Sequence, residues 1–331
     1  MSSNRLVVGI IFSITLTALL LAYEASLLPK SIVGVYFHGI PSDVMMQTLS
    51  IQDLYEQPLK SLWYLHIQPP MFDTIRAILV SFLGSEDLLL SQYRVDTAIY
   101  FLWAIIYGLT CFLIFTIIGT QTSTIYGIFA TLGFCIHPAF LLYATTLDST
   151  LLSTFLILSL IFLLLEIGDG QKISPYLISA SFLALFFTRS IFQWPWVFII
   201  GLCLYLLKYP PQYLKKYFII CICIVALFII KQFLLFHLTT SSSFAGLNLC
   251  RSIDACTGHY IDAKKINHAD PTANSLMREF KSNNAKNFNN SIYLELNKKY
   301  LDDYKEKLFS MSAKELFAIY FNNLIIYLQP W

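Results

Sequence analysis

Charged residues are scarce in this chain. They make up 13% of its 331 residues, whereas hydrophobic residues make up 56%, and the mean hydropathy is strongly positive. A soluble globular chain carries about 25% charged residues and a smaller apolar share. The composition therefore excludes an ordinary soluble domain and predicts an integral membrane protein of the all-α class.

The sequence also lacks a basic run and an N-terminal cleavage signal. Its net charge of +2 is too small to indicate a phosphate-rich polymer as a partner, so nucleic acid is excluded. The apolar segment 6–28 follows only Arg5, is longer than the core of a signal peptide, and has no small-x-small site. We expect this segment to be retained as a first membrane helix.

Most of the seven cysteines lie in apolar segments, where a thiol packs like a small hydrophobic side chain. Cys250 and Cys256 instead lie close together in a polar tail. A disulfide between them would imply an oxidising compartment, and two free thiols are the equal alternative.

Apolar runs define the expected membrane helices, each of which needs about 20 residues to cross a bilayer. Seven segments approach this length: 6–28, 95–118, 124–144, 149–166, 174–192, 195–208 and 217–238. We expect a polytopic bundle, 1–238, followed by a small external α-rich domain, 239–315. The apolar segment 316–331 would rest at the interface or begin an eighth crossing.

The first external loop, 29–94, is expected to hold two helices that lie along the membrane, at about 42–57 and 69–84. In the second helix, apolar residues recur at helical spacing, and Asp73 and Arg76 are three residues apart as a possible ion pair. Such a pair costs several kcal/mol at mid-bilayer and little at the interface. We therefore interpret 69–84 as juxtamembrane.

This topology places many polar residues at one membrane face, the side of the first loop and the tail. They are Asp43, Asp53, His66, Gln68, Arg94, His137, Asp148, Arg189 and Gln193. The opposite face receives Lys208, Lys215 and Lys216, which the positive-inside rule would make cytoplasmic, although basic residues are too evenly divided for charge alone to fix the orientation. Polar residues gathered at one face indicate a functional site there.

Four motifs occur in a fixed order: PSDVMMQTL around Asp43, HIQPPMFDTIRAIL from His66, SQYRVDTAIY around Arg94, and HPAFLLYATTLD ending at Asp148. This ordered set resembles the GT-C superfamily of membrane glycosyltransferases, in the branch similar to protein O-mannosyltransferases and the aminoarabinose transferase of lipid A. The resemblance covers about residues 1–238. It implies transfer of a sugar from a polyprenyl phosphate to an acceptor hydroxyl on the non-cytoplasmic face, with inversion.

The resemblance also implies partners and a location. The acceptor would belong to a glycan, a lipid or a protein, and membrane lipid would surround the bundle. A carrier with one phosphate makes a divalent metal unnecessary, so no cofactor is expected. The membrane would be the bacterial inner membrane with the site facing outward, or the endoplasmic reticulum membrane in a eukaryote.

The first loop would supply the base and part of the pocket. Asp43 matches the family's loop aspartate, and its alternative role is a first-turn carboxylate that favours the helix dipole. Asp53 is the competing base, because spacing cannot rank two aspartates of one loop. His66 and Gln68 precede two prolines that stiffen the chain, and the resemblance implies that they line the pocket.

Basic residues would bind the lipid phosphate. Arg94 and Arg189 could each bind phosphate oxygens or merely extend to ordinary headgroups. Lys231, inside an apolar run, would face the bundle and bind lipid phosphate or pair with a carboxylate. The resemblance implies that Asp148 belongs to the site. Alternatively, its carboxylate only stabilises the start of a helix.

Three further interpretations complete the analysis of the sequence. The tail residues His259, Asp262, His268 and Asp270 fit no compact zinc spacing, so no metal site is predicted. A transporter or flippase for a lipid-linked or amphiphilic substrate is the alternative function, although a transporter often shows two related halves and this sequence shows no internal repeat. A non-catalytic homologue is the third reading.

Overall fold

The computed structural model describes residues 3–27, 42, 48–253, 289 and 292–328. Within these residues every regular element is a helix, so the predicted all-α class is confirmed. The helices are α1 Ser3–Leu27, α2 Ile51–Glu56, α3 Pro58–Trp63, α4 Met71–Leu83, α5 Leu88–Gln121, α6 Thr124–Cys135, α7 Pro138–Ala144, α8 Thr150–Gly168, α9 Pro175–Thr188, α10 Pro195–Leu206, α11 Pro211–Phe236, α12 Ala245–Ser252, α14 Ile292–Ser310 and α15 Ala313–Leu328.

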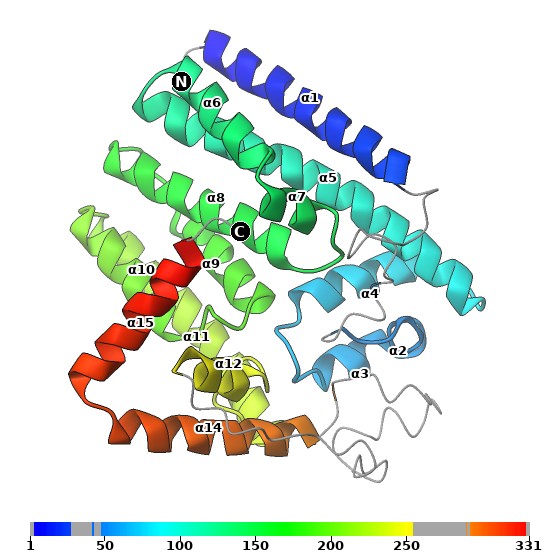
Figure 1. The fold of residues 1–331 in the computed structure, drawn as a ribbon, viewed down its shortest axis with the longest axis vertical. Coiled ribbons are helices and arrows are strands. Elements are labelled where there is room, and N and C mark those ends of the chain that lie inside the picture. Colours follow the sequence, from blue (N-terminus) through cyan, green and yellow to red (C-terminus); the bar gives the residue numbers. More distant parts are fainter. Residues whose placement is uncertain (1–2, 28–41, 43–47, 254–288, 290–291, 329–331) are drawn as a thin grey trace.

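The long helix α5 organises the bundle (Figure 1). It packs against α1, α6 and α8, and the bundle continues from α8 through α9 to α11 and α10. The short helices α2, α3 and α4 gather beside the N-terminal part of α5, and α4 also contacts α9. The first loop therefore covers the end of the bundle at which α5 and α8 begin.

Four helices of the described part are long and apolar enough to cross a membrane: α1, α5, α8 and α11. The pair α6 and α7 adds a fifth if it is one span bent by 70°. At 14 and 12 residues, α9 and α10 extend only about 21 and 18 Å, less than the ~30 Å hydrocarbon core. The four or five long apolar helices are consistent with an integral membrane protein. The predicted count of seven or eight crossings is not supported, because α9 and α10 are too short.

Of the two helices predicted in the first loop, one is present and the other is not continuous. The predicted helix 69–84 matches α4, whereas a continuous helix over 42–57 is wrong, because residues 48–50 are not helical. Ser50 caps α2 by accepting a hydrogen bond from the Asp53 amide, and a second short helix starts at Pro58. Proline disfavours helical geometry in the preceding residue, so the break falls at Gln57.

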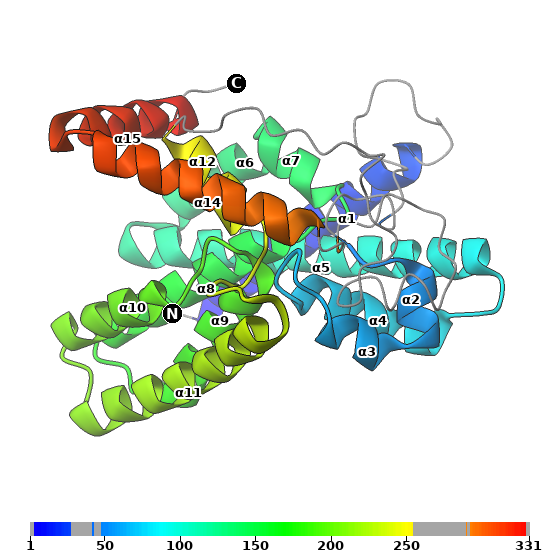
Figure 2. The ribbon, with the colours of Figure 1, turned by 90° about the horizontal axis from the view of Figure 1, so that it is seen from below.

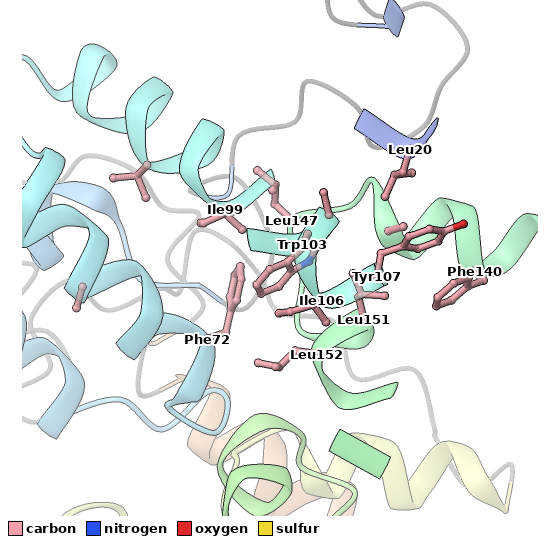
Figure 3. Packing of buried hydrophobic residues seen from close by; sticks show 14 of the residues in the cluster. Leu20, Phe72, Ile99, Trp103, Ile106, Tyr107, Phe140, Leu147, Leu151 and Leu152 are labelled. Atoms are coloured by element: carbon pink, nitrogen blue, oxygen red, sulfur yellow. The ribbon is translucent and has the colours of Figure 1, made fainter. Parts of the chain in front are cut away.

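Trp103 of α5 joins the first loop to the bundle (Figure 3). Its side chain is completely buried, and its ring centroid lies 5.7 Å from that of Phe72 in α4. Leu147 and Leu151 belong to the same buried cluster. The indole Nε1 donates a hydrogen bond to the Asp148 carbonyl oxygen at 3.1 Å. This packing fixes α4 and the start of α8 against the same part of α5.

The polar tail forms a small cluster of its own around α12 and α14, which pack together (Figure 2). The Gly246 amide of α12 donates to Asn297 Oδ1 of α14 at 2.6 Å. Cys250 is disulfide-bonded, while its predicted partner Cys256 lies outside the described residues. The predicted boundary between 315 and 316 falls inside α15, whose 16 residues are fewer than a crossing needs.

Candidate functional site

A buried ion pair lies at the centre of the first loop. Arg76 Nη1 is 2.8 Å from Asp73 Oδ1, and neither side chain is exposed. Gln68 Nε2 donates to Asp73 Oδ2 at 2.8 Å, and the Leu49 amide donates to Asp73 Oδ1 at 3.2 Å. Burial raises the pKa of the Asp73 carboxyl above its ordinary value, while Arg76 and the hydrogen bonds act in the opposite direction.

The same guanidinium holds two other segments. Arg76 Nη1 donates to the Leu49 carbonyl oxygen at 2.6 Å, and Arg76 Nε donates to Ser42 Oγ at 3.1 Å. Ser42 Oγ in turn donates to Asp96 Oδ1 of α5 at 2.6 Å, and its amide donates to Asp96 Oδ2 at 3.2 Å. Ser42 is thus a buried link between α4 and α5.

His66 is enclosed by segments from the tail. Its amide donates to Asn289 Oδ1 at 2.8 Å, and its ring Nδ1 lies 3.0 Å from Ser243 Oγ. The ring packs against Phe236 at the end of α11, with centroids 5.0 Å apart. The ring is fully buried. His66 is thus part of a packed junction, and the pocket role that the resemblance implies for it stays a prediction.

Lys231 of α11 lies beside the same loop. Its Nζ is 3.5 Å from the Leu65 carbonyl oxygen and between 5.3 and 5.7 Å from the ring centroids of Trp63, Phe228 and Phe236. An ammonium over aromatic faces is attracted by their negative centres. Lys231 therefore faces the bundle, as predicted, and contacts the first loop.

Asp148 and Arg189 lie together where α8 begins and α9 ends. Arg189 Nη1 donates to Ser149 Oγ at 3.4 Å, and its charge acts on the neighbouring Asp148 carboxylate. Burial raises the pKa of Asp148; two hydrogen bonds from Thr150, both 2.8 Å, and the Arg189 charge oppose the rise. Asp148 is half-buried, and Arg189 is exposed.

Gln193 connects this pair to the His66 junction. Its Nε2 donates to Ser241 Oγ at 2.8 Å, and its Oε1 accepts from the Ser241 amide at 3.1 Å. Two residues further on, Ser243 donates from its amide to the His66 carbonyl oxygen at 2.7 Å. The end of α9, the segment after α11 and the first loop therefore meet at one end of the bundle.

Arg94 and Asp53 take no part in the site contacts described above. Arg94 is exposed on α5 and makes no hydrogen bond or ion pair with another described residue. Asp53 is buried in α2, and its carbonyl oxygen accepts a hydrogen bond from Ser61 Oγ at 3.1 Å. Asp43, the predicted base, lies outside the described residues.

Asp96 was not among the site residues predicted from the sequence, and the Asp73–Arg76 pair was predicted to lie at the membrane interface. Asp96 stands in an apolar run, and a carboxylate in such a run is itself a signal of a functional or paired group. The Asp73–Arg76 pair was anticipated from its spacing, and its position relative to the membrane stays a prediction. Residues 42, 49 and 68 bind the pair, and both side chains are buried in the protein.

Neither a cluster of metal ligands nor a cavity coincides with the predicted site residues in the described part of the chain. Among the described residues no three His, Cys, Asp or Glu side chains are grouped as a metal site. The tail residues considered from sequence, 259–270, are outside the described part. Two cavities, between α10 and α11 and between α1 and α5, are lined by none of the predicted catalytic or substrate-binding residues.

No protein-family model matches this chain, and neither the curated proteins nor the solved structures include a significant match to it. The resemblance to GT-C glycosyltransferases therefore stays a prediction carried by the ordered sequence motifs.

Proposed function

We propose that this chain is a membrane glycosyltransferase that moves a sugar from a polyprenyl phosphate to an acceptor hydroxyl. The ordered motifs support the proposal, as do the contacts that join the first loop to the ends of α9 and α11. In the proposed topology the membrane is crossed by α1, α5, the bent pair of α6 and α7, α8 and α11. The first loop and the tail then share the non-cytoplasmic face, and in a bacterium the membrane is the inner one.

The neighbouring Asp148 and Arg189 carry the proposal. The leaving group of the reaction is a lipid phosphate, so the enzyme needs a fixed cation at the membrane interface. Arg189 is exposed, and its guanidinium is held at one end by Ser149 beside a carboxylate. A guanidinium so placed can offer two parallel hydrogen bonds to phosphate oxygens. Asp148 then orients Arg189 between turnovers.

The reaction needs one base and no redox step. Asp43 accepts the proton of the acceptor hydroxyl, whose oxygen attacks the anomeric carbon on the face opposite the phosphate. The bond from the anomeric carbon to the phosphate oxygen breaks, and the polyprenyl phosphate leaves with both electrons. Asp53 is less suited to the role, because its side chain is only 2% exposed.

The remaining predicted residues act by shaping the first loop. Lys231 and His66 tie the loop to α11 and to the tail, and Gln68 fixes Asp73. Arg94, exposed on α5, is proposed as a second contact for the phosphate or the sugar. Membrane lipid and the lipid-linked sugar are the partners that these residues require.

The test uses the full chain reconstituted in vesicles with a panel of polyprenyl-phosphate monosaccharides and an extract of envelope lipids and glycans. Loss of sugar from the carrier is measured by mass spectrometry. Asp43→Asn should lower the rate by about 10²–10⁴-fold, the usual contribution of a general base. Asp302→Asn, an exposed tail aspartate, should retain full activity.

Three other outcomes contradict parts of the proposal. Full transfer by Asp43→Asn with loss in Asp53→Asn would move the base to Asp53. Movement of the lipid-linked sugar across the vesicle membrane without any product would favour the transporter or flippase. Inactivity of the unmodified chain toward the whole panel would leave a non-catalytic homologue.

A further inference from the structure

A groove of about 1070 Å³ lies between α10 and the first half of α11. Apolar side chains form most of its wall, from α10 and from one face of α11: Tyr205, Leu206, Leu214, Phe218, Ile219 and Ile222. Figure 2 shows α10 and α11 side by side, with their connection at the left-hand end. The 26 residues of α11 extend about 39 Å, so its Pro211 end is far from Lys231 and the candidate site.

Two lysines lie at the end of this groove. Lys208 belongs to the connection between the helices, and Lys215 lies in the second turn of α11. No acidic residue lines the groove, and neither lysine pairs with a carboxylate in the described part of the chain. An apolar groove with two unneutralised positive charges at one end is complementary to an anionic amphiphile.

The backbone at Lys208 is a second, independent observation. Lys208 has φ 56°, in the left-handed region that glycine prefers. Its amide donates to the Tyr205 carbonyl and the Tyr209 amide donates to the Leu204 carbonyl, a Schellman ending of α10.

The neighbouring turn after α8 ends in the same way but uses glycine. Gly170 has φ 83°, its amide donates to Ile167, and the next amide donates to Glu166. The two turns are in contact, because Tyr209 Oη donates to the Ile173 carbonyl at 2.7 Å. Glycine is the residue that this backbone conformation favours, as at Gly170. The lysine at position 208 therefore indicates that its side chain has a role of its own.

We propose that this groove is a specific site for an anionic phospholipid. One acyl chain lies along the apolar face of α11, and the headgroup phosphate lies between Lys208 and Lys215. The volume is at the upper end of ordinary ligand sites, about 300–1,000 Å³. Tyr205 and Tyr209 are suited to the boundary between headgroups and chains, where aromatic residues concentrate. The site is independent of the proposed transferase reaction.

Cys223 provides a native reporter, because it lines the groove and is exposed. The purified full chain in detergent is alkylated with a maleimide, and the Cys223 peptide is quantified by mass spectrometry during titration with dioleoylphosphatidylglycerol or dioleoylphosphatidylcholine. Phosphatidylglycerol should protect Cys223 at lower concentration than phosphatidylcholine. Lys208→Gly and Lys215→Gln should each raise the phosphatidylglycerol concentration for half-protection about fivefold.

The variants separate lipid binding from folding. Lys208→Gly removes the charge and also relieves the left-handed backbone, so a folding defect cannot explain weaker protection. Lys216→Gln is the matched control, since Lys216 is exposed next to Lys215 but does not line the groove. Equal protection by the two lipids, or an equal effect of Lys216→Gln, would overturn the proposal. Protection that depends on protein concentration without lipid would assign the groove to a second copy and overturn it as well.

Discussion

Arg76 donates from Nη1 to Asp73 Oδ1 at 2.8 Å, and both side chains are completely buried. The same guanidinium binds the Leu49 carbonyl oxygen and Ser42 Oγ, which lie on either side of the segment 43–47. A buried ion pair is tolerated only when further hydrogen bonds satisfy both groups. The pair therefore ties α4 to both sides of the short segment that contains Asp43.

Removing one partner of this pair should destabilise the protein strongly. Asp73→Ala removes a buried carboxylate from the Arg76 guanidinium, and the expected loss is about 3–5 kcal/mol in the free energy of unfolding. Denaturant unfolding in detergent, followed by circular dichroism, measures the change.

An exposed pair of the same spacing is the matched control. Asp302 and Lys305 in α14 are 3.7 Å apart and 61% exposed, so Asp302→Ala should change the free energy by less than about 1 kcal/mol. The double variant Asp73→Leu with Arg76→Met should recover part of the loss, because neither charge of the pair is left without the other. Equal effects of Asp73→Ala and Asp302→Ala would show that the buried Asp73–Arg76 pair stabilises the protein no more than the exposed pair does.

Two glycines of α6 should respond to alanine with opposite signs. A Cβ at Gly127 would lie 3.0 Å from the Phe115 carbonyl oxygen and 3.1 Å from the Gly119 Cα, both backbone atoms of α5. A Cβ at Gly133 would meet nothing within 4 Å. Small residues let helices approach this closely, and backbone atoms cannot move aside as a flexible side chain can.

Gly133→Ala should therefore raise the free energy of unfolding by about 0.5–1 kcal/mol, the ordinary gain from replacing glycine in a helix. Gly127→Ala should lower it by about 1–3 kcal/mol, because the added carbon forces α5 and α6 apart. Thermal unfolding of the two variants measures the difference. A stabilised Gly127→Ala protein would contradict the close approach of the helices.

Long apolar runs made the main helices predictable, because 20 or more apolar residues have few other folds. The lengths of α9 and α10 were predicted less well. The apolar segment predicted over 174–192 corresponds to α9, which ends at Thr188. The segment predicted over 195–208 corresponds to α10, which ends at Leu206, ahead of Pro210. Polar and proline residues next to an apolar run end a helix earlier than a hydropathy count indicates.

The buried face of α4 was not predictable from its periodicity. The pattern marked Ile78 and Phe82 as part of the apolar face, yet they are 53% and 80% exposed, while Asp73 and Arg76 are buried. A helix beside a membrane can turn apolar residues outward, so the ordinary rule of burial fails there. The polar partners come from residues 42, 49 and 68, with Asp96 bound to Ser42 in turn, and no local pattern joins such distant positions.

The pH dependence of stability should include a contribution from Asp148. Burial raises its pKa above the unfolded value of about 3.9, with Arg189 opposing the rise. The native carboxyl then holds its proton at a higher pH than the unfolded one. Its contribution to stability is fully present below the unfolded pKa and is lost as the pH rises through the native pKa.

Lowering the pH from 7 toward 4 should therefore raise the free energy of unfolding more in the unmodified protein than in Asp148→Asn. Denaturant midpoints at a series of pH values measure the difference. Other carboxyl groups are common to both proteins and cancel, and the asparagine oxygen can still accept from the Thr150 amide. Identical pH profiles would show that Asp148 titrates alike in both states.

Arg189 should determine the affinity for the lipid-linked donor if the proposed function holds. Arg189→Lys keeps the charge but loses the planar pair of donors, and a lost hydrogen bond to a charged group is worth about 1.5–3 kcal/mol. The KM for the polyprenyl-phosphate sugar should therefore rise about 10- to 100-fold, with a smaller change in kcat. Arg251→Lys, an exposed arginine of α12, is the control and should leave both constants unchanged. A rise in KM for Arg94→Lys with none for Arg189→Lys would move the phosphate contact to α5.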